Sequence, residues 1–225
     1  METHFNQAGW SCHLYGVDEA APLVVMPVIS GDGREVLAAC RKETRLPFHL
    51  LVLHHEGWND LYSPWPMPSP FEQEGRFLGQ GAETLRVIRA CLLPEAEARL
   101  QASVTERALV GYSMAGLFAL YGALEADVFG WGASVSGSLW APGLGDYLEK
   151  AVGATTLRRF YVSLGNKERK SRNPVLAPLA AESEKAVATL EACGIETTFV
   201  INPGNHFTEP EQRVARAVAW LLNVQ

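Results

Sequence analysis

The sequence predicts an α/β protein with a mostly parallel central sheet and helices on both of its faces. Short runs rich in apolar residues alternate along the chain with amphipathic stretches of helical periodicity. Several of the short runs, among them LVVMPVI, HLLVLH and FYVSL, are almost continuously apolar, as strands covered on both faces must be. Regular alternation of strand and helix favours parallel strands joined by helical crossovers.

Composition and charge narrow the class of protein. The length of 225 residues suits one domain, residues 1–225, with one sizeable core. Hydrophobic residues make up 48% of the chain and charged residues 20%, which disfavours disorder. A formal net charge of −6 without a lysine- or arginine-rich stripe disfavours a nucleic-acid partner.

The cysteines and the N-terminus bear on the compartment. The first nine residues lack the basic and apolar regions of a signal peptide, and no apolar run reaches the length of a membrane span. The cysteines are widely separated, without the spacing of a zinc site: Cys12, Cys40, Cys91 and Cys193. Free thiols in a reducing compartment fit this pattern, so we expect a cytoplasmic protein with no membrane partner. The oligomeric state is not predicted.

The expected elements follow from the apolar runs and the helical periodicity, in chain order. The strands are Ser11–Val17, Pro22–Ile29, Phe48–His54, Arg107–Gly111, Gly132–Ser136, Arg159–Leu164 and Glu196–Ile201. The helices are Arg34–Glu43, Ala82–Leu93, Met114–Leu124, Leu144–Val152, Pro178–Cys193 and Pro210–Leu222. The last helix places Val214, Val218 and Leu221 on one face, with Arg213 and Arg216 on other faces.

The segment Trp58–Phe71 breaks this alternation. Proline occupies every second position of its second half, at Pro64, Pro66, Pro68 and Pro70, which forbids a helix and favours an extended path. Long loops inside a compact domain are often functional. The alternative is a surface excursion that packs its two tryptophans.

A strand–turn–helix motif supplies a candidate nucleophile. The run Gly111-Tyr112-Ser113-Met114-Ala115-Gly116 follows an apolar strand and opens a helix, which is the setting of a nucleophile elbow. The usual pattern is G-x-S-x-G, so Ala115 is a departure, although by the smallest possible side chain. The alternative is a serine that only caps the helix.

Hydrolases with this strand–helix order carry a base and an acid after later strands, in the order serine, acid, histidine. His206 follows the last predicted strand and is the only histidine after Ser113. Glu168 follows the strand before it, in Gly165-Asn166-Lys167-Glu168, and would orient the imidazole. The alternatives are a loop histidine, a surface glutamate among basic neighbours, or a Ser–His dyad without an acid.

Main-chain amides should hold the oxyanion of an acyl-transfer intermediate. One is that of Met114, at the start of the helix. The other is expected from the loop after the third strand, which we count as Phe48–His54, so the amides of Trp58 and then Asn59 are candidates. His54 and His55 are adjacent on a strand and face opposite sides, which argues against a metal site there. No metal or cofactor is expected.

Aromatic residues gather on the loops at the predicted catalytic edge. We expect an apolar substrate pocket lined by Tyr112, Trp140, Trp65 and Tyr62. The alternative is that these rings only pack against the core.

The segments GYSMAGLFALY, SVSGSLWAPG, YVSLGNKERKSRNPV and NPGNHF resemble the putative esterase family of α/β-hydrolases, which includes esterase D-like and enterochelin esterases. The resemblance extends from the second strand to the last helix. It implies the α/β-hydrolase fold and hydrolysis of a small acyl ester by Ser113 and His206, with Glu168 in the acid position. Many relatives carry aspartate there, and the chain lacks the extra N-terminal domain of the siderophore esterases, so their substrate is not implied.

The sequence thus predicts a cofactor-independent serine esterase acting on a small-molecule ester through an acyl-enzyme. A thioesterase or acyltransferase could use the same residues. A protein of this fold that binds a ligand without catalysis is the alternative from another class.

Overall fold

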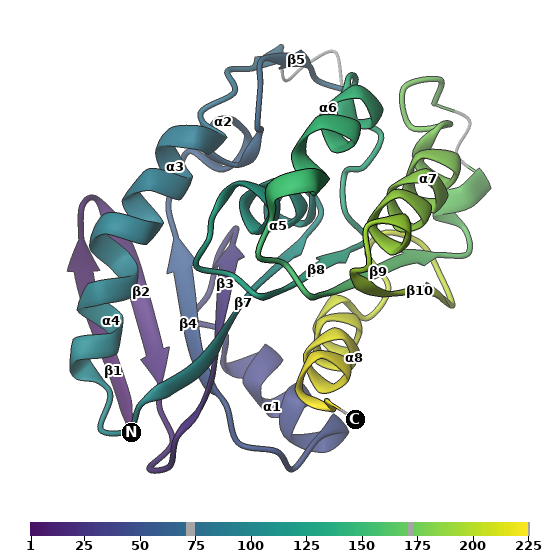
Figure 1. The fold of residues 1–225 in the computed structure, drawn as a ribbon. Helices are drawn as coiled ribbons and strands as arrows, with labels where there is room; N and C mark the ends of the chain where they lie inside the picture. Colours follow the sequence, from purple (N-terminus) through teal and green to yellow (C-terminus); the bar gives the residue numbers. More distant parts are fainter. Residues whose placement is uncertain (71–74, 171–172, 225) are drawn as a thin grey trace.

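The computed structural model describes residues 1–70, 75–170 and 173–224, and their strands form one twisted central sheet (Figure 1). Along the chain these strands are β1 (Glu2–Gln7), β2 (Trp10–Tyr15), β3 (Ala21–Val28), β4 (His49–His54), β7 (Val104–Tyr112), β8 (Trp131–Val135), β9 (Arg159–Gly165) and β10 (Glu196–Asn202). Their order in the sheet is β1-β2-β4-β3-β7-β8-β9-β10. Strands β3, β4, β7, β8, β9 and β10 run parallel, whereas β1 pairs antiparallel with β2, and β2 pairs antiparallel with β4.

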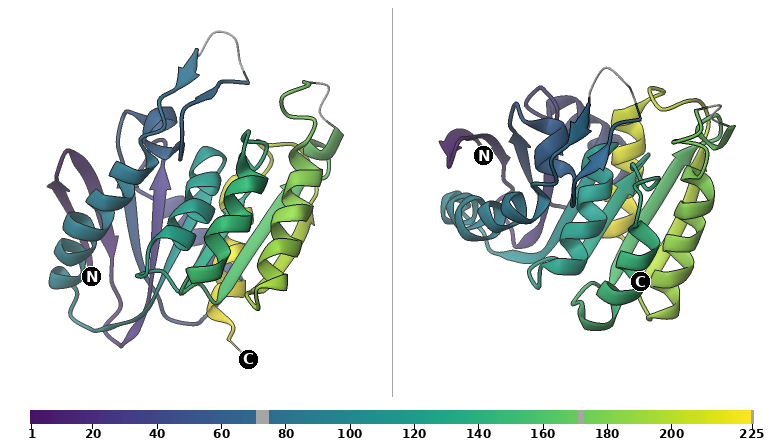
Figure 2. Two further views of the ribbon diagram at one scale, coloured as in Figure 1. Left: turned by 45° about the horizontal axis from the view of Figure 1, so that its top comes forward. Right: turned by 90° about the horizontal axis from the view of Figure 1, so that it is seen from above.

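Helices cover both faces of this sheet, which confirms the predicted fold class. The helices are α1 (Arg34–Glu43), α2 (Trp58–Tyr62), α3 (Gly81–Val87), α4 (Leu93–Arg99), α5 (Met114–Glu125), α6 (Leu144–Ala151), α7 (Leu179–Ala192) and α8 (Pro210–Leu222). Helices α1 and α8 lie side by side on one face, and α3 to α7 cover the other (Figure 2). Within the described residues, no helix is long and apolar enough to cross a membrane.

Each face of the sheet has its own apolar cluster. Side chains of β3 alternate between them: Leu23 and Val25 pack beneath α5, whereas Val24 and Met26 pack beneath α1 and α8. Because both faces are covered, the strands of the parallel part are nearly continuous in apolar residues.

The sheet opens at the carboxyl ends of β3 and β7. The two strands pair only as far as Val25, opposite Leu109, while β3 stays paired with β4 as far as Val28. Pro27 lies just beyond the break and has no amide hydrogen to donate to a neighbouring strand. Helix α1 follows β3 on one face and α5 follows β7 on the other. This is a switch point of the topology, where parallel sheets form a crevice.

The sequence does not predict β1. Phe5 is the buried side chain of this edge strand, which therefore lacks an apolar run. A tight turn at Ala8 and Gly9, with φ of 50° and 85°, joins β1 to β2. With β1 counted, the third strand of the chain is β3 and not Phe48–His54, which matters for the site below.

The helix predicted over Ala82–Leu93 is longer than expected. It runs from α3 through a π-helical segment, Ile88–Leu92, into α4, which ends at Arg99. Pro94 lacks an amide hydrogen and its ring crowds the carbonyl four residues before it. Widening of the helix just ahead of Pro94 accommodates the ring, so the helix continues where the sequence predicts an end.

The proline-rich segment is partly ordered into short elements. It begins with the unpredicted helix α2 and continues into a two-stranded ribbon of β5 (Met67–Pro68) and β6 (Arg76–Phe77). The extended path predicted from the alternating prolines is therefore present in β5. Phe71, the last residue of the predicted segment, lies outside the described residues.

The turn between β7 and α5 requires glycine at its first position. A Cβ on Gly111 would lie 1.9 Å from the Ala115 carbonyl oxygen, whereas a methyl group is tolerated at Ala115 itself, which is fully buried. We expect Gly111→Ala to lower the free energy of unfolding by about 3 kcal/mol or more. Gly145→Ala, in α6, is the control, because its Cβ would meet only Glu182 Oε2, at 4.0 Å, and the change in stability should be less than about 1 kcal/mol. Urea unfolding measures both; a Gly111→Ala variant as stable as the parent would contradict the steric argument.

Candidate active site

Ser113 occupies the sharp turn between β7 and α5. Its φ of 58° and ψ of −121° are unusual for a residue with a side chain and indicate local backbone strain. Main-chain bonds hold this turn: the Ser113 N–H donates to Val135 O (3.2 Å), and Ser113 O accepts from Ser138 (2.9 Å). The serine is thus fixed at the carboxyl edge of the sheet, beside the opening between β3 and β7.

His206 lies on the loop from β10 to α8. Strands β8 and β9 lie between β10 and β7, the strand that Ser113 follows, so this loop crosses their ends to reach the serine. Its Nε2 is 3.1 Å from Ser113 Oγ, and its Nδ1 is 2.7 Å from Glu168 Oε2. The three side chains come from three different segments of the sequence, and the structure brings them together as a continuous hydrogen-bonded chain. Their order, hydroxyl to Nε2 and Nδ1 to carboxylate, is the order a Ser–His–acid triad requires.

Glu168 is buried, so the alternative of a surface glutamate is wrong. Its side chain is only 6% exposed, although the neighbouring Arg169 side chain is 42% exposed. The Glu168 Oε1 atom accepts hydrogen bonds from the Gly165 N–H (2.7 Å) and from Ser136 Oγ (2.9 Å). Burial acts to raise the pKa of Glu168, but the bonds from His206, Gly165 and Ser136 outweigh it and hold the pKa below its usual value. The carboxylate is therefore held ionised.

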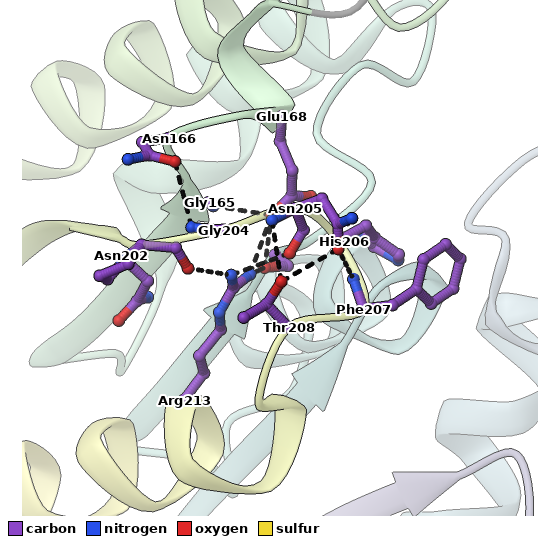
Figure 3. A network of polar contacts seen from close by, with 12 residues as sticks. Gly165, Asn166, Glu168, Asn202, Gly204, Asn205, His206, Phe207, Thr208 and Arg213 are labelled. Carbon is purple, nitrogen blue, oxygen red and sulfur yellow. Dashed lines mark hydrogen bonds and ion pairs between the residues drawn. The ribbon is translucent and has the colours of Figure 1, made fainter.

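Arg213 completes this network. The helical pattern sets it off the apolar stripe of α8 and does not predict that its side chain is buried. Its side chain is 1% exposed. Nη1 donates to Ser136 Oγ (2.8 Å) and lies 3.1 Å from Glu168 Oε1, while Nη2 donates to the carbonyls of Pro203 and Asn205, each at 2.8 Å (Figure 3). One buried cation therefore contacts both the acid and the loop that carries the imidazole.

Further bonds tie the histidine loop to its neighbours. The Tyr112 hydroxyl donates to the His206 carbonyl, and burial raises the pKa of Tyr112, which keeps this donor protonated. The Gly204 N–H donates to Asn166 Oδ1 (3.1 Å), and the Gly204 carbonyl accepts from Lys167 N–H (3.0 Å). The loops after β9 and β10 are thus bonded to each other beside the triad.

Ser113 and His206 open into a cleft of about 700 Å³ between α1 and α8. Its walls are mostly apolar and come from the end of β3, the first turn of α1 and the start of α8. A cavity of this volume and character suits a small-molecule ligand. It lies at the opening between β3 and β7 described above.

Two loops lie at the part of the cleft where a second oxyanion donor is expected. Residues 29–33, between β3 and α1, line the cleft together with Ser113. Trp58 also lines it, but Asn59 is absent from the described lining residues. With β1 counted, β3 is the third strand of the chain, so the loop 29–33 is a further candidate for this donor beside Trp58.

Most of the aromatic residues predicted to bind substrate instead pack the protein. Tyr112 lines the cleft. Tyr62 is fully buried and packs edge-on against Phe118 at 5.2 Å, and Trp140 is buried in the core. Trp65 donates its Nε1 hydrogen to the Pro142 carbonyl (2.8 Å). Tyr62, Trp65 and Trp140 are not among the described residues of the cleft, so the packing alternative holds for them.

The fold is shared with several solved structures. An IroE-like serine hydrolase from Shewanella oneidensis matches with a TM-score of 0.82 at 15% identity, over 99% of this chain and 80% of that chain. The siderophore hydrolase EstB from Aspergillus nidulans matches with a TM-score of 0.76 at 15% identity, over 99% and 94%. The enterobactin esterase FES from Shigella flexneri matches with 0.68 at 17% identity, over 98% of this chain but 58% of that chain.

Sequence comparison gives the family. No curated protein sequence matches the chain significantly. A family model described as "Putative esterase" matches residues 31–211, which include the candidate triad and most of the sheet. The chain therefore belongs to the putative esterase family, hydrolases that act on ester bonds and have the α/β-hydrolase fold.

Proposed function

We propose that the protein is a serine-dependent carboxylic ester hydrolase that works through an acyl-enzyme. Ser113 is the nucleophile, His206 the general base and acid, and Glu168 the carboxylate that orients the imidazole. This proposal rests on one observation, which is the hydrogen-bonded row of the three side chains. Ser113 Oγ lies 3.1 Å from His206 Nε2, and His206 Nδ1 lies 2.7 Å from Glu168 Oε2. Membership of the esterase family supports an ester as the substrate.

The geometry allows each step of such a reaction. His206 Nε2 takes the Ser113 proton as Oγ attacks the ester carbonyl, and Glu168 stabilises the imidazolium that results. The Met114 N–H, at the start of α5, and an amide of the loop 29–33 are the proposed oxyanion donors. The imidazolium then protonates the leaving alkoxide. Water, deprotonated by His206, then attacks the acyl carbonyl. The bond from this carbon to Ser113 Oγ breaks, the imidazolium returns its proton to Oγ, and the acid leaves.

The proposed mechanism does not identify the natural substrate. EstB is named as a siderophore hydrolase and FES as an enterobactin esterase, but at 15% and 17% identity the likeness carries only the fold. A thioesterase would share every step up to the acyl-enzyme and differ in its leaving group. Acyl thioesters therefore belong in the substrate panel beside p-nitrophenyl esters.

Removal of the nucleophile or the base tests the proposal directly. We expect Ser113→Ala and His206→Ala to lower kcat for p-nitrophenyl acetate by about 10⁴-fold or more. A fluorophosphonate probe should label the parent at Ser113 and label neither variant. His54→Ala, at the end of β4 and outside the triad, is the matched histidine control and should label normally. A folded parent that never labels would refute the role of Ser113.

Acid stability tests the buried carboxylate. Because the pKa of Glu168 is lowered in the fold, its ionisation stabilises the protein above the ordinary carboxyl pKa of about 4.3, and this contribution is lost as pH falls further. We expect Glu168→Gln to lose about 3 kcal/mol at pH 7, because buried Arg213 loses its ionised partner, and to approach the parent near pH 3. Urea unfolding at pH 7, 5 and 3.5 measures this. A difference in unfolding free energy between parent and variant that does not change with pH would contradict this expectation. The control is Glu191→Gln, which changes an exposed glutamate.

Arg213 is proposed as a positioning residue that acts through Glu168 and the histidine loop. We expect Arg213→Met to lower kcat about 10-fold or more with little change in KM, and Arg213→Lys to restore part of the loss. The acidic limb of the kcat profile should move to higher pH, because Glu168 loses a neighbouring cation.

Arg216→Met is the matched control, one turn along α8. Its guanidinium bonds Asn202 Oδ1 at 2.9 Å and contacts none of the triad residues in the described structure. Both methionine variants lose one arginine from the same helix, and a purely structural role of Arg213 predicts a loss of stability with an unchanged pH profile. That outcome would remove Arg213 from the proposal.

A further inference from the structure

The two most exposed large apolar side chains among the described residues both lie at the cleft. Ile29 is 64% exposed and Phe207 is 84% exposed, and both line the cavity that contains Ser113 and His206. Single exposed apolar residues are common on protein surfaces and need no explanation. Two of them on opposite walls of one cleft, one after β3 and one after β10, indicate a surface that a ligand covers.

The Phe207 ring is held in place although no neighbouring helix or strand buries it. Its backbone N–H donates to Asn205 Oδ1 (3.0 Å), and its ring meets the His206 imidazole edge-on at 5.2 Å. Figure 3 shows the ring pointing away from the polar network of Glu168 and Arg213. The backbone of Phe207 is therefore held beside the imidazole, and its ring lies exposed at the cleft.

Deeper in the cleft the walls remain apolar. Met26, Pro27 and Val28 contribute from β3, Val36 from α1 and Val214 from α8. These side chains lie on the side of Ser113 toward β3, next to the loop 29–33. An acyl chain whose carbonyl oxygen points at that loop would extend along these walls, because the leaving group must lie against His206 to receive its proton.

Negative charge dominates the rim of the cleft. Asp32, Glu35 and Glu211 line it, and Arg34 is the basic residue among the described lining residues apart from His206. The Arg34 guanidinium is already paired, since it contacts Glu2 and lies 3.4 Å from Asp32 Oδ2. A substrate carboxylate would therefore meet the carboxylates of Glu35 and Glu211 and no free cation among these residues.

We propose that the cleft binds an apolar acyl group that carries no negative charge, with Ile29 as a specificity-determining residue on the acyl side and Phe207 beside the leaving group. This inference rests on the proposed function of Ser113, because it assigns the acyl side of the same reaction. It distinguishes neutral and cationic acyl esters from acyl esters that end in a carboxylate.

A substrate series with one leaving group tests both parts. p-Nitrophenyl acetate, butyrate and hexanoate vary the apolar length, and hexanoates ending in a carboxylate or a trimethylammonium group vary the charge. We expect kcat/KM to rise about 10-fold or more from acetate to hexanoate. The carboxylate ester should be about 10-fold poorer than hexanoate at low ionic strength, with the gap narrowing in salt, while the trimethylammonium ester is not disfavoured.

Variants assign these effects to residues. Ile29→Ala should lower the hexanoate-to-acetate ratio of kcat/KM about 5-fold, whereas Leu78→Ala, which removes a side chain that is 57% exposed outside the described cleft lining, should not. Glu35→Gln with Glu211→Gln should bring the ratio of neutral to anionic hexanoate toward unity. Glu191→Gln removes the same kind of charge from the end of α7 and should leave that ratio unchanged.

The outcomes separate this inference from the proposed function. Labelling and acetate turnover through Ser113 without any preference for length or charge would overturn the inference alone. A preference for the carboxylate ester would overturn it as well. Absence of turnover and of probe labelling in the folded protein would overturn the proposed function itself.

Discussion

The buried guanidinium of Arg213 is the constraint on which the rest of the site depends. A cation that is 1% exposed is tolerated only when its donors find acceptors, and here these are a carboxylate, a hydroxyl and two carbonyls. The acceptors follow β8, β9 and β10, whereas Arg213 belongs to α8. They meet only when α8 packs against the sheet, so the same packing step that buries Val218 and Leu221 also assembles the Ser113–His206–Glu168 geometry.

The site contains a strained backbone at Ser113 and a buried carboxylate at Glu168, and surrounding contacts offset the free-energy cost of both. The unfavourable φ of Ser113 is held by bonds to β8 and by Gly111, which leaves room for the Ala115 carbonyl. Ionised Glu168 is retained in a buried place because four hydrogen-bonding groups converge on its carboxylate. Such preorganisation favours chemistry in which charge develops on the imidazole and on a carbonyl oxygen, since little reorganisation accompanies the reaction.

Sequence patterns predicted the fold class and most helices and strands because these depend on local apolar runs, which the alternating faces of β3 illustrate. They also predicted Ser113, Glu168 and His206, since each follows a strand of the parallel sheet. Arg213 was missed because the helical pattern shows only that it lies off the apolar stripe of α8. Its partners, Ser136 and the carbonyl of Pro203, are defined by tertiary contacts. The strand β1 was missed for a simpler reason, because an edge strand with one buried residue leaves too weak an apolar pattern to be recognised.

The two walls of the cleft differ in how freely they can change. Ile29 and Val36 lie on the β3–α1 side, and neither contacts the network of Glu168 and Arg213 in the described structure, so substitutions there can alter the acyl pocket while the triad keeps its geometry. Phe207 is different. Its N–H shares Asn205 with Arg213, which bonds the Asn205 carbonyl, and its ring touches His206. A substitution at Phe207 therefore also alters the contacts that hold the imidazole. Substitutions on the β3–α1 wall would change the shape of the cleft with less effect on the triad.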